Sequence, residues 1–425
     1  MTTDRQTLVD WIDADRERLI DFLQAFIRAK SPNPPGDTRQ AVEHITNFLD
    51  QEGLEHEVVA PQAEMPNIVA AFGDPVRAKG QDDPNGGRHL VLNGHIDVFP
   101  VGEGHGWTAD PWGGEIRDGK IFGRGACDMK CGTTASIFTY AYLHRLKDRL
   151  KGRLTLTCVS DEETFGPWGA RWLIANRPDV HGDAMLNGEP GSPYNIRFGE
   201  KGPLWLRFNV RSRGVHGAYA HLSEGAVKTS MALIGELMAL EDIEAKPSHN
   251  IARAIDEARD YLNLAMGEGA SDVIPKVTVN IGTIEGGLKV NMIPDHCSFE
   301  ADIRLPLGVE KETIMAEVIK IVGDRTDVEF EEINFTPPNW CDPYDDLAET
   351  ISAVAKELKD IDTMPIVSLG TTDARLWRAL GIPAFNYGPF AHGMGGADEH
   401  VEIEEFLHIV KTHTLVAYDF LMATG

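Results

Sequence analysis

The sequence predicts an α/β protein in which helices flank a mixed central sheet and a smaller α+β domain is inserted into the larger one. Short β-rich runs alternate with helical patterns, and half-exposed strands replace this alternation from about residue 203. The 425 residues also exceed one ordinary core, at roughly 150 residues per domain. We therefore expect a larger domain at 1–202 and 335–425 and an insertion at 203–334.

The elements of the larger domain follow from local patterns along the chain. Apolar positions recur at helical spacing over 8–29, the Pro-rich loop 31–37 interrupts them, and a second helix is expected at 40–52. The β-rich runs lie at 89–94, 153–159, 183–188 and 383–388, and further helical patterns lie at 131–147 and 168–176. This alternation is typical of a sheet covered by helices.

The inserted segment has a different pattern. The runs LWLRFNV, KVTVNIGTI and HCSFEADIRL alternate apolar and polar residues, as half-exposed strands do. With helices expected at 223–241 and 309–323 and the run VEFEEI after the second of them, the predicted order is β-α-β-β-α-β. Residues 242–272 are charged and helical in pattern, and we expect them to form a surface elaboration.

Composition limits the classes of partner and the cellular location. Forty basic and 66 acidic residues give a formal net charge of −26, which disfavours nucleic acid and anionic membrane surfaces as partners. The five cysteines contain no CxxC pair, so neither a disulfide framework nor a thiolate zinc site is predicted. The N-terminus lacks a hydrophobic signal region, and no apolar run approaches the ~20 residues of a membrane span. We expect a cytoplasmic protein.

Histidine and carboxylate side chains follow several of the predicted strands, where ligands bind in open α/β sheets. They are His95, Asp97, Glu162, Glu163 and Glu189, and Asp128 joins them from the loop GRGACDMK before a predicted helix. Any one of them alone would more commonly be a helix cap or a solvated turn residue. Several carboxylates buried together, however, need a compensating cation, because like charges otherwise force protonation. The pattern therefore predicts a metal centre.

The donor types indicate which metal such a centre would hold. Histidine and carboxylate without thiolate suit zinc, or alternatively cobalt or manganese. Asp128, Glu163 and Glu189 balance two divalent ions if one hydroxide bridges them, so we expect two metals that activate a shared water. Asp97 is expected to accept the second ring N–H of His95. GxGxxG, Walker and GxSxG motifs are absent from the sequence, which excludes nucleotide-binding and serine-hydrolase interpretations.

Seven stretches together resemble one known family. They are NGHIDVFP, GWTADPWGGEIRDGKIFGRGACDMKCG, SDEETFGPWGA, NGEPG, EGGLKVNMIPDHCSFEADIR, GTTDARLW and DEHVE. In this order they resemble the dinuclear zinc metallopeptidase family of acetylornithine deacetylase, succinyl-diaminopimelate desuccinylase, aminoacylase-1 and carboxypeptidase G. The resemblance implies an α/β catalytic domain with an inserted lid domain, and we expect a homodimer formed through that lid.

The resemblance also implies roles for individual residues. By position, His95 and Glu189 are expected to bind one metal and Glu163 the other, and Asp128 to bridge them. Asp97 would support His95 with its carboxylate. The neighbouring Glu162 resembles the general base, which must reach the activated water and return its proton to the leaving nitrogen.

Further roles fall in the insertion and near the C-terminus. His216 resembles the histidine that stabilises the oxyanion, although a surface turn histidine is the alternative and His221 lies nearby. Asn291 and Arg304 resemble residues that bind the substrate carboxylate, unless Arg304 pairs with carboxylates on its own strand. Thr372, Asp373 and Arg375 resemble a loop that contacts substrate.

One position departs from the family pattern. Many relatives carry the last histidine ligand four residues before the Glu of a terminal DE or NE pair, where this chain has Gly395. We expect His392 to serve instead, on a glycine-rich loop, with His400 as the alternative. If neither reaches the metal, the site would be mononuclear or specialised.

The predicted function is cleavage of the amide bond of a small N-acyl amino acid or dipeptide-like substrate by a metal-activated water, with Glu162 as general base. The substrate would be a small molecule that carries a carboxylate. An aminohydrolase that displaces an amine from an aromatic or amidine carbon is an alternative within the same chemistry. A non-catalytic metal-binding scaffold is the alternative from another class, and the presence of Glu162 beside every carboxylate ligand argues against it.

Overall fold

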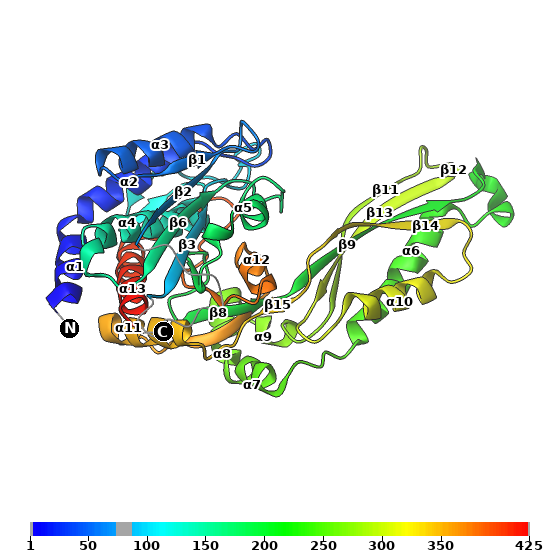
Figure 1. The fold of residues 1–425 in the computed structure, drawn as a ribbon. Helices are drawn as coiled ribbons and strands as arrows, with labels where there is room; N and C mark the ends of the chain where they lie inside the picture. The colour runs from blue at the N-terminus through cyan, green and yellow to red at the C-terminus, as the bar shows by residue number, and fades with distance from the viewer. Residues whose placement is uncertain (1–2, 74–86, 424–425) are drawn as a thin grey trace. The chain divides into compact units, whose positions relative to one another are not determined.

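A computed structural model describes residues 3–73 and 87–423 and confirms the predicted fold class (Figure 1). The chain forms two compact units. The first contains Met1–Phe198, Cys341–Ile366 and Thr372–Gly425, and the second contains Gly199–Trp340 and Val367–Thr371. Among the described residues, no helix is both long and apolar enough to cross a membrane.

The first unit is built on a mixed sheet with the strand order β1-β2-β6-β3-β7-β17-β8, and β16 pairs with β8. The strands are β1 (Glu57–Val59), β2 (Asn67–Phe72), β3 (His89–His95), β6 (Arg153–Val159), β7 (Ala184–Asn187), β8 (Asn195–Glu200), β16 (Met364–Ser368) and β17 (Ala384–Asn386). β3 is parallel to β6 and β7, whereas β2 is antiparallel to β6. Every residue of β3 is buried, which fits the apolar run Leu90, Val91 and Leu92 within it.

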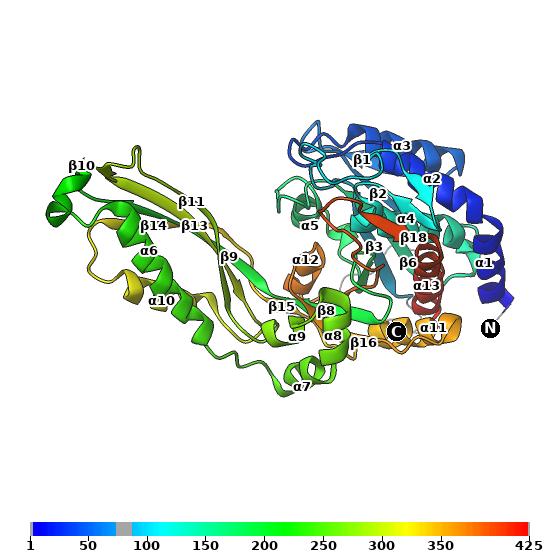
Figure 2. The same ribbon diagram turned by 180° about the vertical axis from the view of Figure 1, so that it is seen from behind.

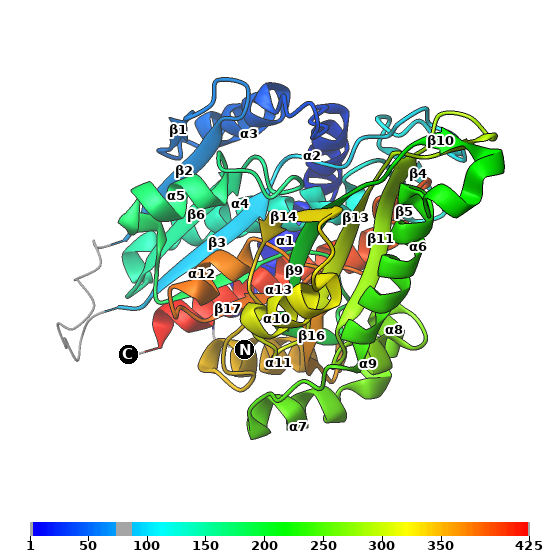
Figure 3. The same ribbon diagram turned by 90° about the vertical axis from the view of Figure 1, so that its right-hand side faces the viewer.

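Helices cover both faces of this sheet. They are α1 (Thr3–Ala14), α2 (Arg16–Arg28), α3 (Arg39–Gln51), α4 (Cys131–His144), α5 (Ala170–Asn176), α11 (Asp346–Lys359), α12 (Ala374–Ala379) and α13 (Ile403–Met422). α4 and α13 pack together against β3, and α11 lies beside α13 (Figure 2). On the opposite face, α5 and α12 cover the sheet (Figure 3). Leu173 of α5 and Trp377 of α12 belong to the same buried cluster as Val91 and Met185 of the sheet.

Shorter elements complete the first unit. A small sheet has the order β18-β5-β4, with β4 (Glu115–Arg117), β5 (Lys120–Phe122) and β18 (His400–Glu402). Single turns of helix are η1 (Ala126–Lys130), η2 (Lys147–Arg149) and η3 (Pro178–Val180). The π-type turn η1 leads directly into α4, and Asp128 within it has non-helical backbone angles.

One helix boundary differs from the prediction. The helix expected over 8–29 begins at Thr3 and is divided at Asp15 into α1 and α2. Asp15 has φ −87° and ψ 11°, but its N–H still donates to the carbonyl of Trp11 and its carbonyl accepts from Leu19, so the interruption is confined to this residue. The Tyr142 hydroxyl donates to the Asp15 carboxylate, a contact that helical periodicity does not reveal.

The second unit contains an antiparallel sheet with the order β11-β13-β9-β14. Its strands are β9 (Gly202–Arg211), β11 (Thr278–Gly286), β13 (His296–Leu305) and β14 (Val328–Phe335), and its main helices are α6 (Ala226–Leu237) and α10 (Lys311–Val322). The remaining elements are β10 (Val215–His216), η4 (Gly217–Leu222), η5 (Met238–Asp242), α7 (His249–Glu257), α8 (Arg259–Met266), α9 (Ala270–Val273), β12 (Met292–Ile293) and β15 (Asn339–Trp340). The four long strands and two main helices occur in the expected β-α-β-β-α-β order.

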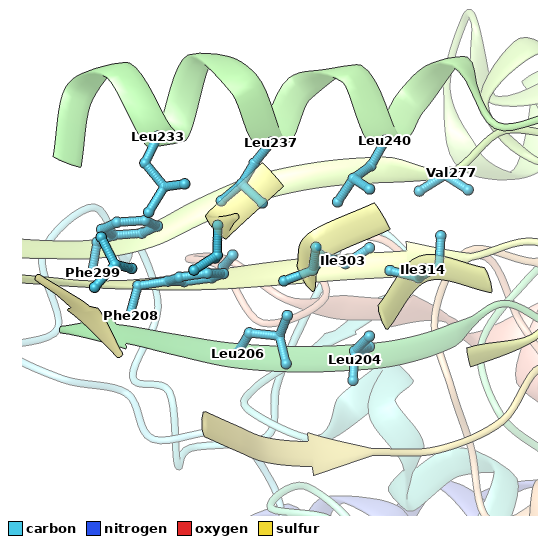
Figure 4. Packing of buried hydrophobic residues seen from close by; sticks show 14 of the residues in the cluster. Leu204, Leu206, Phe208, Leu233, Leu237, Leu240, Val277, Phe299, Ile303 and Ile314 are labelled. Atoms are coloured by element: carbon cyan, nitrogen blue, oxygen red, sulfur yellow. The ribbon is translucent and has the colours of Figure 1, made fainter. Parts of the chain in front are cut away.

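One face of this sheet forms the core of the second unit. Figure 4 shows Leu233 and Leu237 of α6 above Phe208 and Phe299 of the sheet. The two phenylalanine rings stack with centroids 4.8 Å apart and planes 9° from parallel. The burial of β13 alternates along its length, as expected for a strand with one solvated face.

Candidate metal centre

Three neighbouring strands end where the predicted ligands begin. His95 is the last residue of β3, Glu162 and Glu163 follow β6, and Glu189 follows β7. Because β3 is parallel to both β6 and β7, the carboxyl ends of the three strands meet at one edge of the sheet. The turn η1 brings Asp128 to the same edge from the N-terminal side of α4.

His95 lies between two carboxylates. Its Nε2 atom is 3.3 Å from Asp128 Oδ1 and 3.4 Å from Glu189 Oε1. Two overlapping sets of donor atoms, each lying within 4.8 Å of one another, could hold an ion. One set is His95, Asp128 and Glu163, and the other is His95, Glu162 and Glu189.

The electrostatics of the cluster fit a bound cation. Burial, reinforced by neighbouring carboxylates, raises the pKa of Glu162, Glu163 and Glu189. Burial opposes the charging of His95, but its hydrogen bonds with Asp128 and Glu189 raise its pKa well above the ordinary value. Glu163 Oε1 is buried and, within residues 3–73 and 87–423, has no hydrogen-bond partner. An unpaired buried carboxylate oxygen is costly, and a divalent cation at this place would compensate it.

Asp97 supports the cluster differently from the prediction. His95 Nδ1 is 2.9 Å from the main-chain carbonyl oxygen of Asp97, while the nearer carboxylate oxygen lies 3.7 Å away. The carboxylate instead accepts hydrogen bonds from Asn33 Nδ2 at 2.8 Å and from the N–H groups of Glu162 and Glu163 at 3.3 and 3.1 Å. The carbonyl therefore orients the imidazole, and the carboxylate holds the turn that carries both glutamates.

The segment that resembles a substrate-contacting loop, with Thr372, Asp373 and Arg375, lies beside Glu162. Arg375 Nη1 is 3.4 Å from Glu162 Oε1 and 3.8 Å from Asp373 Oδ1, and both Arg375 and Asp373 are buried. The guanidinium also lies over the ring of Phe165, at 4.9 Å. Thr372 is likewise buried. Arg375 thus contacts the predicted general base directly, and contact of these three residues with substrate stays a prediction.

Comparison with known proteins identifies the family. Residues 91–419 match the family model described as Peptidase family M20/M25/M40. The chain belongs to this peptidase family. A succinyl-diaminopimelate desuccinylase of Cereibacter sphaeroides strain KD131 is 30% identical over 376 residues, which cover 84% of this chain and 87% of the relative. The resemblance found in the sequence is confirmed, and the chain is a metal-dependent hydrolase.

Solved structures share the fold. The di-peptidase Dug1p of Saccharomyces cerevisiae aligns over 100% of both chains with a TM-score of 0.76 and 16% identity. The YXEP protein of Bacillus subtilis, described as a dinuclear metal-binding peptidase from the M20 family, aligns over 96% of this chain and 99% of its own. Its TM-score is 0.61 and its identity 17%.

The last ligand predicted for this M20/M25/M40 member stays open. The rings of His392 and His400 stack on each other, with centroids 4.8 Å apart and planes 3° from parallel. His400 Nδ1 lies 2.8 Å from the carbonyl oxygen of Asp398, and its Nε2 lies 3.5 Å from Lys120 Nζ. Among the described residues, neither histidine belongs to a donor set that could hold an ion.

Three predicted residues belong to the second unit. His216 ends β10, and its Nδ1 accepts a hydrogen bond from the N–H of Ala218 at 3.2 Å. Arg304 on β13 pairs with Asp302 at 2.9 Å, which was the local alternative for this residue. Asn291 is exposed, and its carbonyl accepts from the N–H of Gly217 at 2.8 Å. Their roles toward an oxyanion or a substrate carboxylate stay predictions.

Sequence reasoning missed several residues that support the cluster. Asn33, from the Pro-rich loop, bonds to Asp97, and Asn93 Nδ2 lies 3.5 Å from Asp373 Oδ2. Arg124 and Glu399 form a buried ion pair beside Asp128. The position of Glu399 within DEHVE was a signal for it, because that stretch carried the family resemblance. The hydrogen bond between Glu399 and the N–H of Asp128 joins residues 271 positions apart, so no local sequence pattern could indicate it.

Proposed function

We propose that this chain cleaves the amide bond of a small N-acyl amino acid or dipeptide-like substrate that carries a carboxylate. The observation that carries the proposal is the buried cluster in which His95 meets Asp128 and Glu189, with Glu162 and Glu163 alongside. The family and its desuccinylase and dipeptidase relatives support this class of substrate.

In this proposal the cluster holds two divalent cations. His95 and Glu189 would hold one and Glu163 the other, Asp128 would be shared by both, and His392 or alternatively His400 would be a further ligand. Once bound, the cations lower the pKa of a water molecule and polarise the substrate carbonyl. The histidine and carboxylate donors of the two sets suit zinc, with cobalt or manganese as alternatives.

The side chains around the cations orient groups and move protons. Glu162 accepts the proton of the attacking water and returns it to the leaving nitrogen, so it must stay ionised and close to that water. The Arg375 guanidinium lies 3.4 Å from the Glu162 carboxylate and favours its ionised form. The Asp97 carboxylate accepts the N–H of Glu162 and so restrains the turn that carries it. His216 stabilises the oxyanion, and Asn291 and Arg304 bind the substrate carboxylate.

We also propose that the protein works in the cytoplasm as a homodimer formed through the second unit. All five cysteines lie within the described residues and are free thiols, which suits a reducing compartment. The net charge of −26 disfavours nucleic acid and membrane surfaces as partners. The dimer is supported by the resemblance of the insertion to a lid domain.

Product analysis tests the proposed reaction. Zinc-loaded or manganese-loaded protein is incubated with N-acetyl, N-succinyl and aromatic N-acyl amino acids, dipeptides and activated aromatic amines, and the products are identified by mass spectrometry. The expected result is a free amino acid plus an acyl acid or a second amino acid, abolished by chelation and by Glu162→Gln. Release of ammonia alone would contradict amide cleavage and indicate an aminohydrolase. Metal binding without turnover of any substrate would favour a scaffold.

A further inference from the structure

Glu399 is a fully buried carboxylate that contacts the turn carrying Asp128. Its Oε1 atom accepts hydrogen bonds from the N–H groups of Cys127 and Asp128, each at 3.2 Å. Both N–H groups belong to η1, in which Asp128 has φ −116° and ψ 99°. The acceptor comes from the segment preceding β18, far along the chain from the turn that it holds.

The other oxygen of Glu399 faces a buried arginine. Arg124 Nη1 donates to Glu399 Oε2, and the side chains of the two residues are 3% and 0% exposed. Arg124 Nη2 also donates to the carbonyl oxygens of Gly395 and Gly396, at 2.9 and 3.0 Å. One ion pair thus connects the Asp128 turn with the glycine-rich loop that follows His392.

These contacts have a direct consequence for Asp128. Its carboxylate lies 3.3 Å from His95 Nε2. Because the Asp128 side chain is attached to the backbone next to the 127–128 peptide group, the orientation of that group affects where the carboxylate lies. Because Oε1 accepts from the N–H on each side of Cys127, Glu399 restrains that peptide group. Buried carboxylates that accept hydrogen bonds from backbone N–H groups form strong, directional contacts.

We propose that Glu399 is a positioning residue for the metal centre, which presets the bridging carboxylate of Asp128 before a cation binds. The proposal rests on the proposed function, because it assumes that Asp128 is a ligand. Arg124 makes the burial of Glu399 tolerable, since a buried charge without a partner is strongly destabilising. Removal of a residue that hydrogen-bonds to a metal ligand and orients it commonly lowers metal affinity 10-fold to 100-fold.

The test compares two buried glutamates of the first unit. Glu399→Gln removes the charge, whereas Glu405→Gln changes a carboxylate on α13 that accepts the N–H of Phe390 instead. Zinc affinity is measured by competition with a chromophoric chelator, and the stability of the metal-free proteins by thermal unfolding. We expect Glu399→Gln to weaken zinc binding about 10-fold to 100-fold and Glu405→Gln to stay within about threefold of wild type. Unchanged zinc affinity in a destabilised Glu399→Gln protein would show a merely structural role and overturn the proposal.

A second measurement does not depend on a folded variant. In metal-free wild-type protein, the amides of Cys127 and Asp128 should be protected from hydrogen exchange, because Glu399 already holds them. Fast exchange of both amides, with protection only after zinc is added, would overturn the proposal. Failure of the proposed function is distinguishable, because a wild-type protein without zinc affinity would refute the metal centre itself, and with it this inference.

Discussion

Replacement of Asp97 by Asn tests whether its carboxylate holds the turn of the two glutamates. The fully buried carboxylate accepts three hydrogen bonds, from Asn33 Nδ2 and the N–H of Glu163 on Oδ2, and from the N–H of Glu162 on Oδ1. An asparagine has only one acceptor oxygen. If that oxygen takes the Oδ2 position, two bonds remain, and an amide N–H₂ opposes the N–H of Glu162.

The cost follows from this count of hydrogen bonds. One bond to a charged acceptor is lost, worth about 1.5–3 kcal/mol, and the other two lose the strengthening that the negative charge gives. We expect Asp97→Asn to lower the free energy of unfolding of the metal-free first unit by about 2–4 kcal/mol. Zinc affinity should fall about 10-fold to 100-fold, because the turn carries Glu163.

Urea unfolding and chelator-competition titration measure these two effects. The matched control is Asp398→Asn, because Asp398 also accepts a backbone N–H and a side-chain donor, both from Thr108, but in an exposed setting. The control should change stability by less than about 0.5 kcal/mol. Equal, small effects in both variants would refute the argument that the Asp97 carboxylate, rather than its carbonyl, restrains the glutamate turn.

Three other predictions concern catalysis, the pH dependence of stability and the core of the second unit. Glu162→Gln should lower kcat about 10²-fold to 10⁴-fold while zinc content stays unchanged, and an active variant would exclude Glu162 as the base. Burial lowers the pKa of His413 from 6.5 to about 4, so, as the pH falls, this histidine is protonated in the unfolded chain before it is protonated in the folded protein. The resulting contribution to the free energy of unfolding is fully present above pH 6.5 and falls by about 3 kcal/mol as the pH is lowered to 4. In urea titrations over this pH range, His413→Gln should make the free energy of unfolding depend less steeply on pH. Phe299→Ala should destabilise the second unit by about 3–5 kcal/mol in thermal unfolding, and a change below 1 kcal/mol would contradict the tight stacking on Phe208.

The sheet and most ligand candidates could be predicted because their signals are local. The apolar run before His95 and the β-rich run before Glu162 each mark a buried strand, and residues after parallel strands meet at one edge. The predicted helix over 8–29 was less accurate, because the break at Asp15 depends on local backbone angles and on a contact with Tyr142. Periodicity alone does not contain that contact.

The same distinction separates the two functions of Asp97. Its spacing from His95 indicated that the two residues interact, but spacing does not reveal whether the carbonyl or the carboxylate meets the ring. In the structure the carbonyl does so, which frees the carboxylate to bind Asn33 and the glutamate turn. The residue was therefore identified correctly, but the resemblance implied its carboxylate where the carbonyl makes the contact.

The glycine-rich loop shows why the last ligand could not be assigned from motif spacing. At the position where many relatives carry histidine, Gly395 offers only its backbone, and Arg124 Nη2 binds its carbonyl at 2.9 Å. The same arginine neutralises Glu399, which holds the Asp128 turn. The loop therefore contacts the metal centre through its main-chain carbonyls, Arg124 and Glu399, although residue 395 has no side chain that could bind a metal.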